Sequence, residues 1–236
     1  MTEASLTHEQ RLERTLRETD YPFTYFVINP LNRLLLRPLH ALHVSPTTVT
    51  ILSFAMALVA AWFLGRSVRD PGWAGVGGVV FAFLSHLLDA LDGDLARYRQ
   101  RFSAFGAALD PILDRVGECA WIAAVVLATG PTPASAQAGM ACLGGILTYY
   151  YVVDGPVRFA LAARVHETRR FAVTSGTATR TRLKYGLFEP YTYGFPLLVA
   201  FGFANGALWG FAAAFWMATL WQVVRLPARV RPTTDR

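Results

Sequence analysis

Four aspartates lie within one stretch, DALDGDLARYRQRFSAFGAALDPILD, at the edges of two long apolar runs. Asp89 and Asp92 are three residues apart, and Asp110 and Asp114 are four apart, so each pair projects from one face of a helix. A turn between the two helices would bring them side by side, so that the four carboxylates converge. Ionised carboxylates are costly beside lipid and repel one another, so cations are expected to offset their charge.

The donor set of this cluster consists of carboxylate oxygens alone. Such a set suits the hard divalent ions Mg²⁺ and Mn²⁺, and it leaves room for waters and a phosphorylated substrate. Two such ions roughly 4 Å apart can clamp a phosphoryl group during a displacement reaction. The spacing therefore predicts a two-metal site for phosphoryl chemistry.

The residues between the two pairs fit the same chemistry. Gly93 and Gly106 let another group approach the backbone closely, and Ala96 keeps one helix face small. Arg97 offers a planar fork of donors that matches a phosphate. The alternative is structural, an interhelical network of ion pairs that joins the acids to Arg97, Arg99 and Arg115.

Three further polar residues lie near the acids in the sequence. Glu118, one turn after Asp114, either orients that carboxylate or makes a hydrogen bond between packed helices. His86 lies one turn before Asp89, and a metal-ligand role is the less favoured interpretation for it. Asp94 is expected to face solvent.

The elements that must position these residues are membrane spans. The 236 residues are 53% hydrophobic and only 16% charged, compared with about 25% charged residues in soluble domains. The predicted fold class is therefore all-α, a polytopic membrane protein with six transmembrane helices, and a tight loop around Asn205 and Gly206 is expected between the last two. The six segments approach the roughly 20 residues that a bilayer requires, and they are 47–65, 73–91, 105–128, 137–163, 188–205 and 207–225.

An amphipathic segment precedes the first span. Residues 21–43 mix aromatics and leucines with arginines and histidines, which is typical of a helix lying in the membrane interface. A short soluble helix packed on the bundle is the alternative. Ser45 and Pro46 then predict the start of the first span, with serine as the N-cap and proline at the first helical position.

The basic residues are distributed unevenly between the two sides of the predicted bundle. The net charge is +6, and the loops on one side carry only Arg66 and Arg69 of the 22 basic residues. Both termini and the acidic cluster are therefore predicted on the cytosolic side of an inner or plasma membrane. No nucleic-acid-binding module is visible, so the positive charge is attributed to orientation and to contact with anionic lipids.

The chain is predicted to form one domain. Residues 1–20 are a polar cytosolic segment, expected to be partly mobile, residues 21–225 form the membrane domain, and residues 226–236 are a basic cytosolic tail. The first 20 residues lack the apolar core of a signal peptide, so a cleavable signal is not expected.

The acidic stretch resembles the signature of the CDP-alcohol phosphotransferases, also called CDP-alcohol phosphatidyltransferases. Upstream, VSPTTVTILS is similar to the start of the family's first span, which commonly reads Pro-Asn-x-x-Thr; Pro46 and Thr50 fit, and Thr47 replaces the usual Asn. The segment TDYPFTYFVINPLNRLLLRPLHAL looks closest to the branch that makes inositol-containing phosphodiesters, including di-inositol phosphate synthases. The fixed positions of the signature, D-x2-D-G-x2-A-R-x8-G-x3-D-x3-D, are all matched, by Asp89, Asp92, Gly93, Ala96, Arg97, Gly106, Asp110 and Asp114.

The resemblance implies roles for individual residues. Two Mg²⁺ or Mn²⁺ ions would be bound by Asp89, Asp92, Asp110 and Asp114. Asp114 would also be the catalytic base that takes the proton of the acceptor. The CDP site would be formed by Gly93, Ala96, Arg97 and Gly106, with contributions from Asp89 and Thr50. The protein would be a homodimer, as is common in the family.

The resemblance also implies the reaction. The hydroxyl of an alcohol or sugar-phosphate acceptor would attack the β-phosphorus of a CDP-alcohol, and CMP would leave as a phosphodiester forms. CDP-diacylglycerol is the favoured donor, which indicates phospholipid biosynthesis; the alternative is a soluble donor such as CDP-inositol, with an inositol phosphate as acceptor. Two other classes stay open, a non-catalytic metal-binding membrane protein and a cation transporter. The complete signature disfavours the first, and the position of the acids at a cytosolic edge disfavours the second.

Charged residues in the second half of the chain are candidates for the acceptor site. Asp154 and Arg158 lie four residues apart inside the fourth predicted span, and they either satisfy each other or contribute to acceptor binding. The basic loop 164–184 could bind a phosphate on the acceptor. Glu189 could hold acceptor hydroxyls, although a packing role is favoured.

Overall fold

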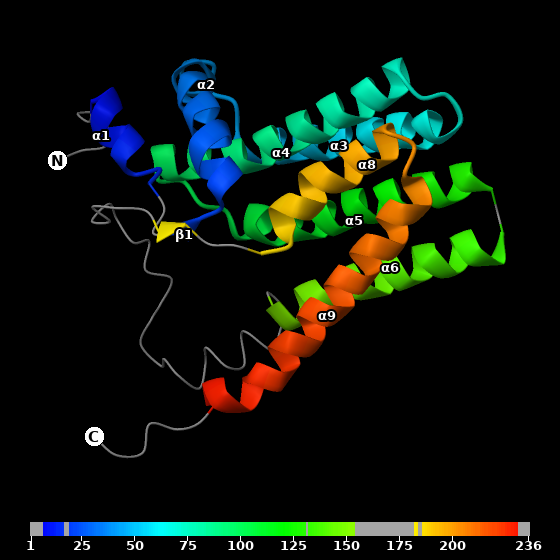
Figure 1. Ribbon diagram of the computed structural model, residues 1–236. Coiled ribbons are helices and arrows are strands. Elements are labelled where there is room, and N and C mark those ends of the chain that lie inside the picture. The colour runs from blue at the N-terminus through cyan, green and yellow to red at the C-terminus, as the bar shows by residue number, and fades with distance from the viewer. Residues whose placement is uncertain (1–6, 17–18, 131, 154–181, 184–185, 231–236) are drawn as a thin grey trace.

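The chain is almost entirely helical in the residues that the structure describes. The computed structural model describes residues 7–16, 19–130, 132–153, 182–183 and 186–230 (Figure 1). Its only strands within these ranges are two short segments that pair in parallel, Thr19 with Arg182 and Asp20 with Leu183. The elements are α1 (His8–Glu13), β1 (Thr19–Asp20), the π-helical turn η2 (Thr24–Ile28), α2 (Asn29–Ala41), α3 (Pro46–Arg69), α4 (Trp73–Arg99), α5 (Ala104–Thr129), α6 (Pro133–Val153), β2 (Arg182–Leu183), the π-helical turn η3 (Pro190–Gly194), α8 (Phe195–Ala200) and α9 (Ala204–Val230).

Three of the described helices, α3, α4 and α9, are long and apolar enough to cross a membrane. They coincide with the predicted spans 47–65, 73–91 and 207–225, and α4 continues two turns beyond its predicted end. Helix α5 and the described part of α6 match two further predicted spans. The predicted span 188–205 is divided into η3 and α8.

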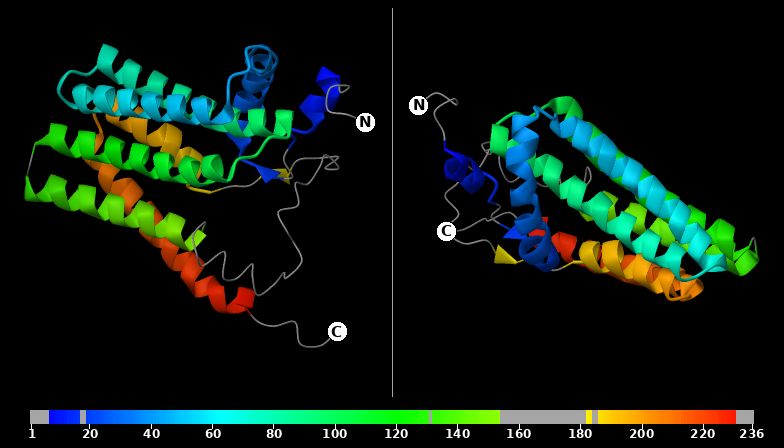
Figure 2. Two further views of the ribbon diagram at one scale, coloured as in Figure 1. Left: turned by 180° about the vertical axis from the view of Figure 1, so that it is seen from behind. Right: turned by 90° about the horizontal axis from the view of Figure 1, so that it is seen from above.

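Helix α3 is the central scaffold of the bundle, and it packs along both α4 and α5 (Figure 2). As predicted, Ser45 caps its start by accepting a hydrogen bond from the backbone N–H of Thr48 at 3.0 Å, and Pro46 occupies the first turn. A Cβ added at Gly117 of α5 would lie 3.0 Å from the Cβ of Ala57, so the two backbones approach closely there. The indole N–H of Trp121 donates to the Ala57 carbonyl at 2.9 Å and locks the same crossing.

An apolar core joins α3 and α5 to the second half of the chain. The side chains of Leu64, Ile122 and Val125 are fully buried together with Tyr191, which lies in η3, and Phe195, the first residue of α8. Helices α6 and α9 pack against each other on the far side of this core (Figure 1). The bundle therefore holds α4 and α5 in a fixed relation, which the acidic residues require.

Helix α2 runs across the end of the bundle at a steep angle to α3 and α4 (Figures 1 and 2). Arg99, the last residue of α4, fastens it there: its guanidinium donates to the carbonyls of Leu39 at 2.6 Å and Val44 at 2.5 Å, and to Nδ1 of His40 at 3.2 Å. Partial burial, followed by the nearby charges of Arg11 and Arg99, lowers the pKa of His40. A neutral ring is the form that can accept this hydrogen bond.

The N-terminal segment, expected to be partly mobile, includes helix α1, which begins with a capping box between Thr7 and Gln10 and places Nδ1 of His8 2.7 Å from the hydroxyl of Tyr98. One expectation about a turn is wrong. The turn before the last helix lies at 201–203 rather than at Asn205 and Gly206. Gly202 there adopts a φ of +85°, which favours glycine, whereas Asn205 and Gly206 belong to the first turn of α9.

Replacing Arg99 by Met tests the fastening of α2. The substitution leaves two carbonyls near the end of α2 without their donor, so we expect a loss of about 1–3 kcal/mol of stability. Thermal unfolding of the detergent-solubilised protein measures this as a lower Tm. The matched control is Arg37→Met on the exposed side of α2, which should leave Tm nearly unchanged; equal Tm values for the two variants would contradict the assigned role of Arg99.

Candidate active site

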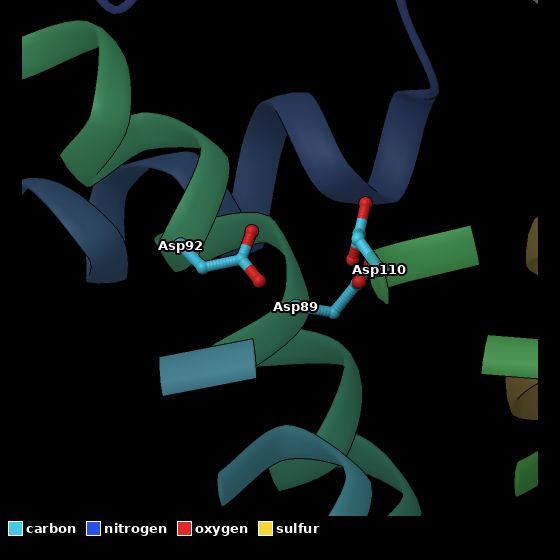
Figure 3. Close-up of side chains that lie close together, drawn as sticks. All are labelled: Asp89, Asp92 and Asp110. Atoms are coloured by element: carbon cyan, nitrogen blue, oxygen red, sulfur yellow. The ribbon is translucent and has the colours of Figure 1, made fainter. Parts of the chain in front are cut away.

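Three of the four aspartates meet at one point between α4 and α5. Asp89 and Asp92 project from α4 towards Asp110 of α5 (Figure 3). One carboxylate oxygen from each of these residues lies within 4.8 Å of the other two. Asp114 lies one turn further along α5, and the side chain of Asp89 contacts those of both Asp110 and Asp114. The structure thus brings Asp89, Asp92 and Asp110 to one point, and Asp114 lines the same cavity beside them.

The donor atoms fit a hard divalent cation. The Oδ1 atom of Asp110 is buried and accepts no hydrogen bond from the described residues, so a cation would satisfy it. Asp92 is buried, and the hydroxyl of Thr50 in α3 donates to its Oδ2 atom. This contact fixes the direction of the Asp92 carboxylate, which is what a neighbour of a metal ligand does. Mg²⁺ and Mn²⁺ match this oxygen-only set.

The arginines near the acids have partners that differ from the ion-pair network considered as the structural alternative. Arg99 binds the end of α2, as described above, and Arg97 pairs with Asp94 at 2.6 Å. Arg115 pairs with Glu118 at 2.6 Å and lies 3.8 Å from Asp114. Arg115 thus forms an ion pair with Asp114 at the edge of the acid cluster.

A first cavity, termed cavity A, lies on one side of the acids and has a volume of about 380 Å³. It is bordered by the start of α3, the last turns of α4 and the start of α5. A Cβ at Gly106 would lie 3.2 Å from Oγ of Ser103, the hydroxyl that caps α5, so this wall has little room for a side chain. The residues that line cavity A include all the predicted CDP-site positions except Asp89, namely Thr50, Gly93, Ala96, Arg97 and Gly106.

A second cavity, termed cavity B, lies on the other side and has a volume of about 320 Å³. Asp89 and Asp114 border it together with residues of the N-terminal segment, Asp20, Tyr21 and Thr24. The residues common to both cavities are Asp92, Gly93, Arg97 and Asp110. The acid cluster therefore forms the boundary between two spaces, each large enough for part of a substrate.

Glu189 holds the N-terminal wall of cavity B. Its carboxylate accepts hydrogen bonds from the backbone N–H groups of Phe23 at 3.1 Å and Thr24 at 2.7 Å, and from the Thr24 hydroxyl at 3.1 Å. That hydroxyl lies 3.3 Å from Nε2 of His86, whose Nδ1 is 4.0 Å from Asp89. Of the two roles considered for Glu189, the structure shows the packing role. The interaction joins the start of η2 to η3.

A buried polar contact lies next to the acids, where the sequence indicated an exposed side chain. Asp94 is 4% exposed and binds Arg97 and Asn32, so the expectation that it faces solvent is wrong. The physical reason is that α2 covers this face of α4, and nothing in the α4 sequence indicates that cover. Glu118 pairs with Arg115 rather than with Asp114. Asp154, Arg158 and most of the loop 164–184 lie outside the described residues.

Comparisons with known proteins agree with these observations. The sequence model of the family described as CDP-alcohol phosphatidyltransferase matches residues 43–225. A bifunctional IPC transferase and DIPP synthase from Rubrobacter xylanophilus is 36% identical over 107 residues, which are 45% of this chain and 23% of that protein. A phosphatidylinositol phosphate synthase from Cutibacterium acnes is 34% identical over 129 residues, which are 52% of this chain and 58% of that protein. The chain thus spans about a quarter of the first relative and less than two thirds of the second.

A solved structure has the same fold. The phosphatidylinositol phosphate synthase of Mycobacterium tuberculosis, crystallised with CDP-DAG bound, superposes with a TM-score of 0.61 and covers 87% of this chain and 100% of its own. Its sequence identity to this chain is 18%, so the likeness concerns the fold.

Thr50→Val tests the support of Asp92. Removing the hydroxyl leaves the Asp92 carboxylate without its orienting donor, so we expect Mn²⁺ affinity to fall by about tenfold. Titration with Mn²⁺, followed by electron paramagnetic resonance of the remaining aqueous ion, measures it. Thr48→Val, at an exposed threonine of the same helix end, is the control. Wild-type Mn²⁺ affinity in Thr50→Val would show that Asp92 needs no such support.

Proposed function

Because the chain belongs to the CDP-alcohol phosphatidyltransferase family, we propose that it is a membrane-integral transferase. It moves a phosphatidyl or other substituted phosphoryl group from a CDP-alcohol to an acceptor hydroxyl and releases CMP. The observation that carries this proposal is the convergence of Asp89, Asp92 and Asp110 at the boundary between two cavities. A donor in one cavity and an acceptor in the other would meet at the acids.

Cavity A is proposed to bind the CDP part of the donor. Ala96 and Gly106 keep its walls small, and Arg97 offers N–H donors that match a phosphate. Asp89, Asp92, Asp110 and Asp114 would hold two Mg²⁺ or Mn²⁺ ions, which would stabilise the charge on the transferred phosphoryl group and on the departing CMP. Thr50 contributes to this site through its hydrogen bond to Asp92.

Asp114 is proposed to be the base. Its carboxylate borders cavity B, where the acceptor hydroxyl would lie, and it contacts Asp89. The Asp114 carboxylate takes the proton as the acceptor oxygen attacks the β-phosphorus. Its position, rather than its proton affinity, would suit it to act as the base, because bound metal ions would lower the proton affinity of a neighbouring carboxylate.

CDP-diacylglycerol is the proposed donor, and an alcohol or a sugar phosphate is the proposed acceptor. Phospholipid biosynthesis is the process that this donor implies. A soluble donor such as CDP-inositol, with an inositol phosphate acceptor, is the second candidate. The relative from Rubrobacter xylanophilus, named for IPC transfer and DIPP synthesis, favours the second, whereas phosphatidylinositol phosphate synthases favour the first.

The proposed membrane arrangement has six spans, with α2 in the cytosolic interface and both termini in the cytosol. Support comes from the steep angle of α2 to α3 and α4 (Figure 1) and from two large exposed side chains, Leu34 of α2 and Leu42 directly after it, each 73% exposed. The uneven distribution of arginines supports the orientation. A homodimer is proposed from the family resemblance alone.

Asp114→Asn tests the proposed base. The Asn side chain has the shape of Asp but is not a base, so it cannot take the proton from the hydroxyl of the acceptor substrate. We therefore expect CMP release to fall at least 100-fold. CDP binding should stay measurable, because Asp89, Asp92 and Asp110 still offer a metal site. The assay is CMP release from CDP-diacylglycerol with Mn²⁺, and Asp70→Asn, at an exposed carboxylate, is the control. Near-normal turnover of Asp114→Asn would exclude Asp114 as the base.

A substrate screen tests the reaction itself. CDP-diacylglycerol and CDP-inositol are each combined with glycerol 3-phosphate, serine, inositol and inositol phosphate, and products are identified by mass spectrometry. We expect CMP and a phosphodiester from at least one pair that includes an inositol compound. A purified protein that converts no CDP-alcohol but carries Mn²⁺ into liposomes would instead be a cation transporter.

A further inference from the structure

A buried polar contact lies directly behind the acid site. Asp94 in α4 is 4% exposed, and a carboxylate is seldom buried to this degree unless it is paired. Its Oδ1 atom accepts a hydrogen bond from Nη2 of Arg97 at 2.6 Å, and its Oδ2 atom accepts one from Nδ2 of Asn32 at 3.1 Å. Asn32 belongs to α2 and is 0% exposed. One carboxylate therefore connects α2 to an arginine of the acid site.

The contact fixes one end of the Arg97 guanidinium and leaves the group at the cavity surface. The side chain of Arg97 is 28% exposed, whereas that of Asp94 is 5% exposed, so the anchor is buried and the guanidinium reaches both cavities. A Cβ at Gly93 would lie 3.3 Å from Nη2 and 3.4 Å from Nη1 of Arg97, which shows that the guanidinium lies close over this glycine. A long side chain held in this way loses less freedom when it binds an anion.

We propose that Asp94 and Asn32 are positioning residues for the donor site. They hold the guanidinium of Arg97 in the place where it meets the pyrophosphate of a CDP-alcohol. The inference rests on the proposed function, and it goes beyond it because neither residue is a fixed position of the family signature. Asn32 also precedes the family match at residues 43–225. The proposal therefore gives α2, which lies outside that match, a role in nucleotide binding.

Binding of CDP itself tests this role, because CDP is common to every candidate donor. Isothermal titration of the purified full chain with CDP and Mg²⁺ compares the wild type with Asp94→Asn, which keeps the shape, and Asn32→Leu, which removes the amide. Each variant should bind CDP about tenfold more weakly. With CDP-diacylglycerol, KM should rise more than kcat falls. Asp70→Asn, which removes an exposed carboxylate 3.4 Å from Arg66, is the control and should not change CDP affinity.

An Arg97→Met background separates positioning from a general structural effect. If Asp94 acts through Arg97, adding Asp94→Asn to Arg97→Met should cause no further loss of CDP affinity. A loss of the same size in both backgrounds, or wild-type CDP affinity in both single variants, would overturn the positioning role. A wild-type protein that does not bind CDP with Mg²⁺ would overturn the proposed function instead. Tm values of all variants identify those that fail to fold.

Discussion

Repulsion among carboxylates that two helices hold at fixed positions is the constraint on which this structure depends. Asp89, Asp92 and Asp110 cannot separate, because α4 and α5 are packed against α3 along their lengths. The backbone contact of Gly117 with Ala57 and the indole hydrogen bond of Trp121 set that packing. Cations bound between the carboxylates would offset this repulsion. The apolar core therefore stabilises the acid site, because the free energy of packing offsets the repulsion among the carboxylates.

Several polar residues around the acid cluster hold it in place. Thr50 orients Asp92 from α3, Asp94 holds Arg97 from within α4, and Glu189 holds the backbone at Thr24. Through Thr50 the site is joined to α3, and through the hydrogen bond of Asn32 to Asp94 it is joined to α2, so it is supported from several directions. Thr24 of η2 and Asn32 of α2 also take part, although both precede the family match at residues 43–225.

The signature residues could be predicted because helical spacing alone determines which side chains share a face. The i,i+3 and i,i+4 pairs needed only a turn between two helices to converge, and the turn after Arg99 supplies it. Asp94 could not be predicted, because its burial depends on α2, which is distant in sequence and crosses α4. The turn at Gly202 was misplaced because Asn-Gly is a strong turn signal that the first turn of α9 can also contain. Local sequence patterns therefore predicted which residues form the site. The residues that hold them in place depend on the packing of helices that are distant in sequence, which local patterns do not reveal.

The length of α4 has a consequence for where the reaction takes place. Its 27 residues make a rod about 40 Å long, whereas the apolar part of a bilayer is about 30 Å thick. Placed as a span, the helix would extend about two turns past the hydrocarbon, and these turns contain Asp92 to Arg99. Asp92 and Arg97 would then be held just above the lipid tails, and Asp89 one turn below them, by an uninterrupted helix rather than by a loop. That height is the level of phospholipid headgroups, so a lipid donor could present its pyrophosphate without leaving the membrane.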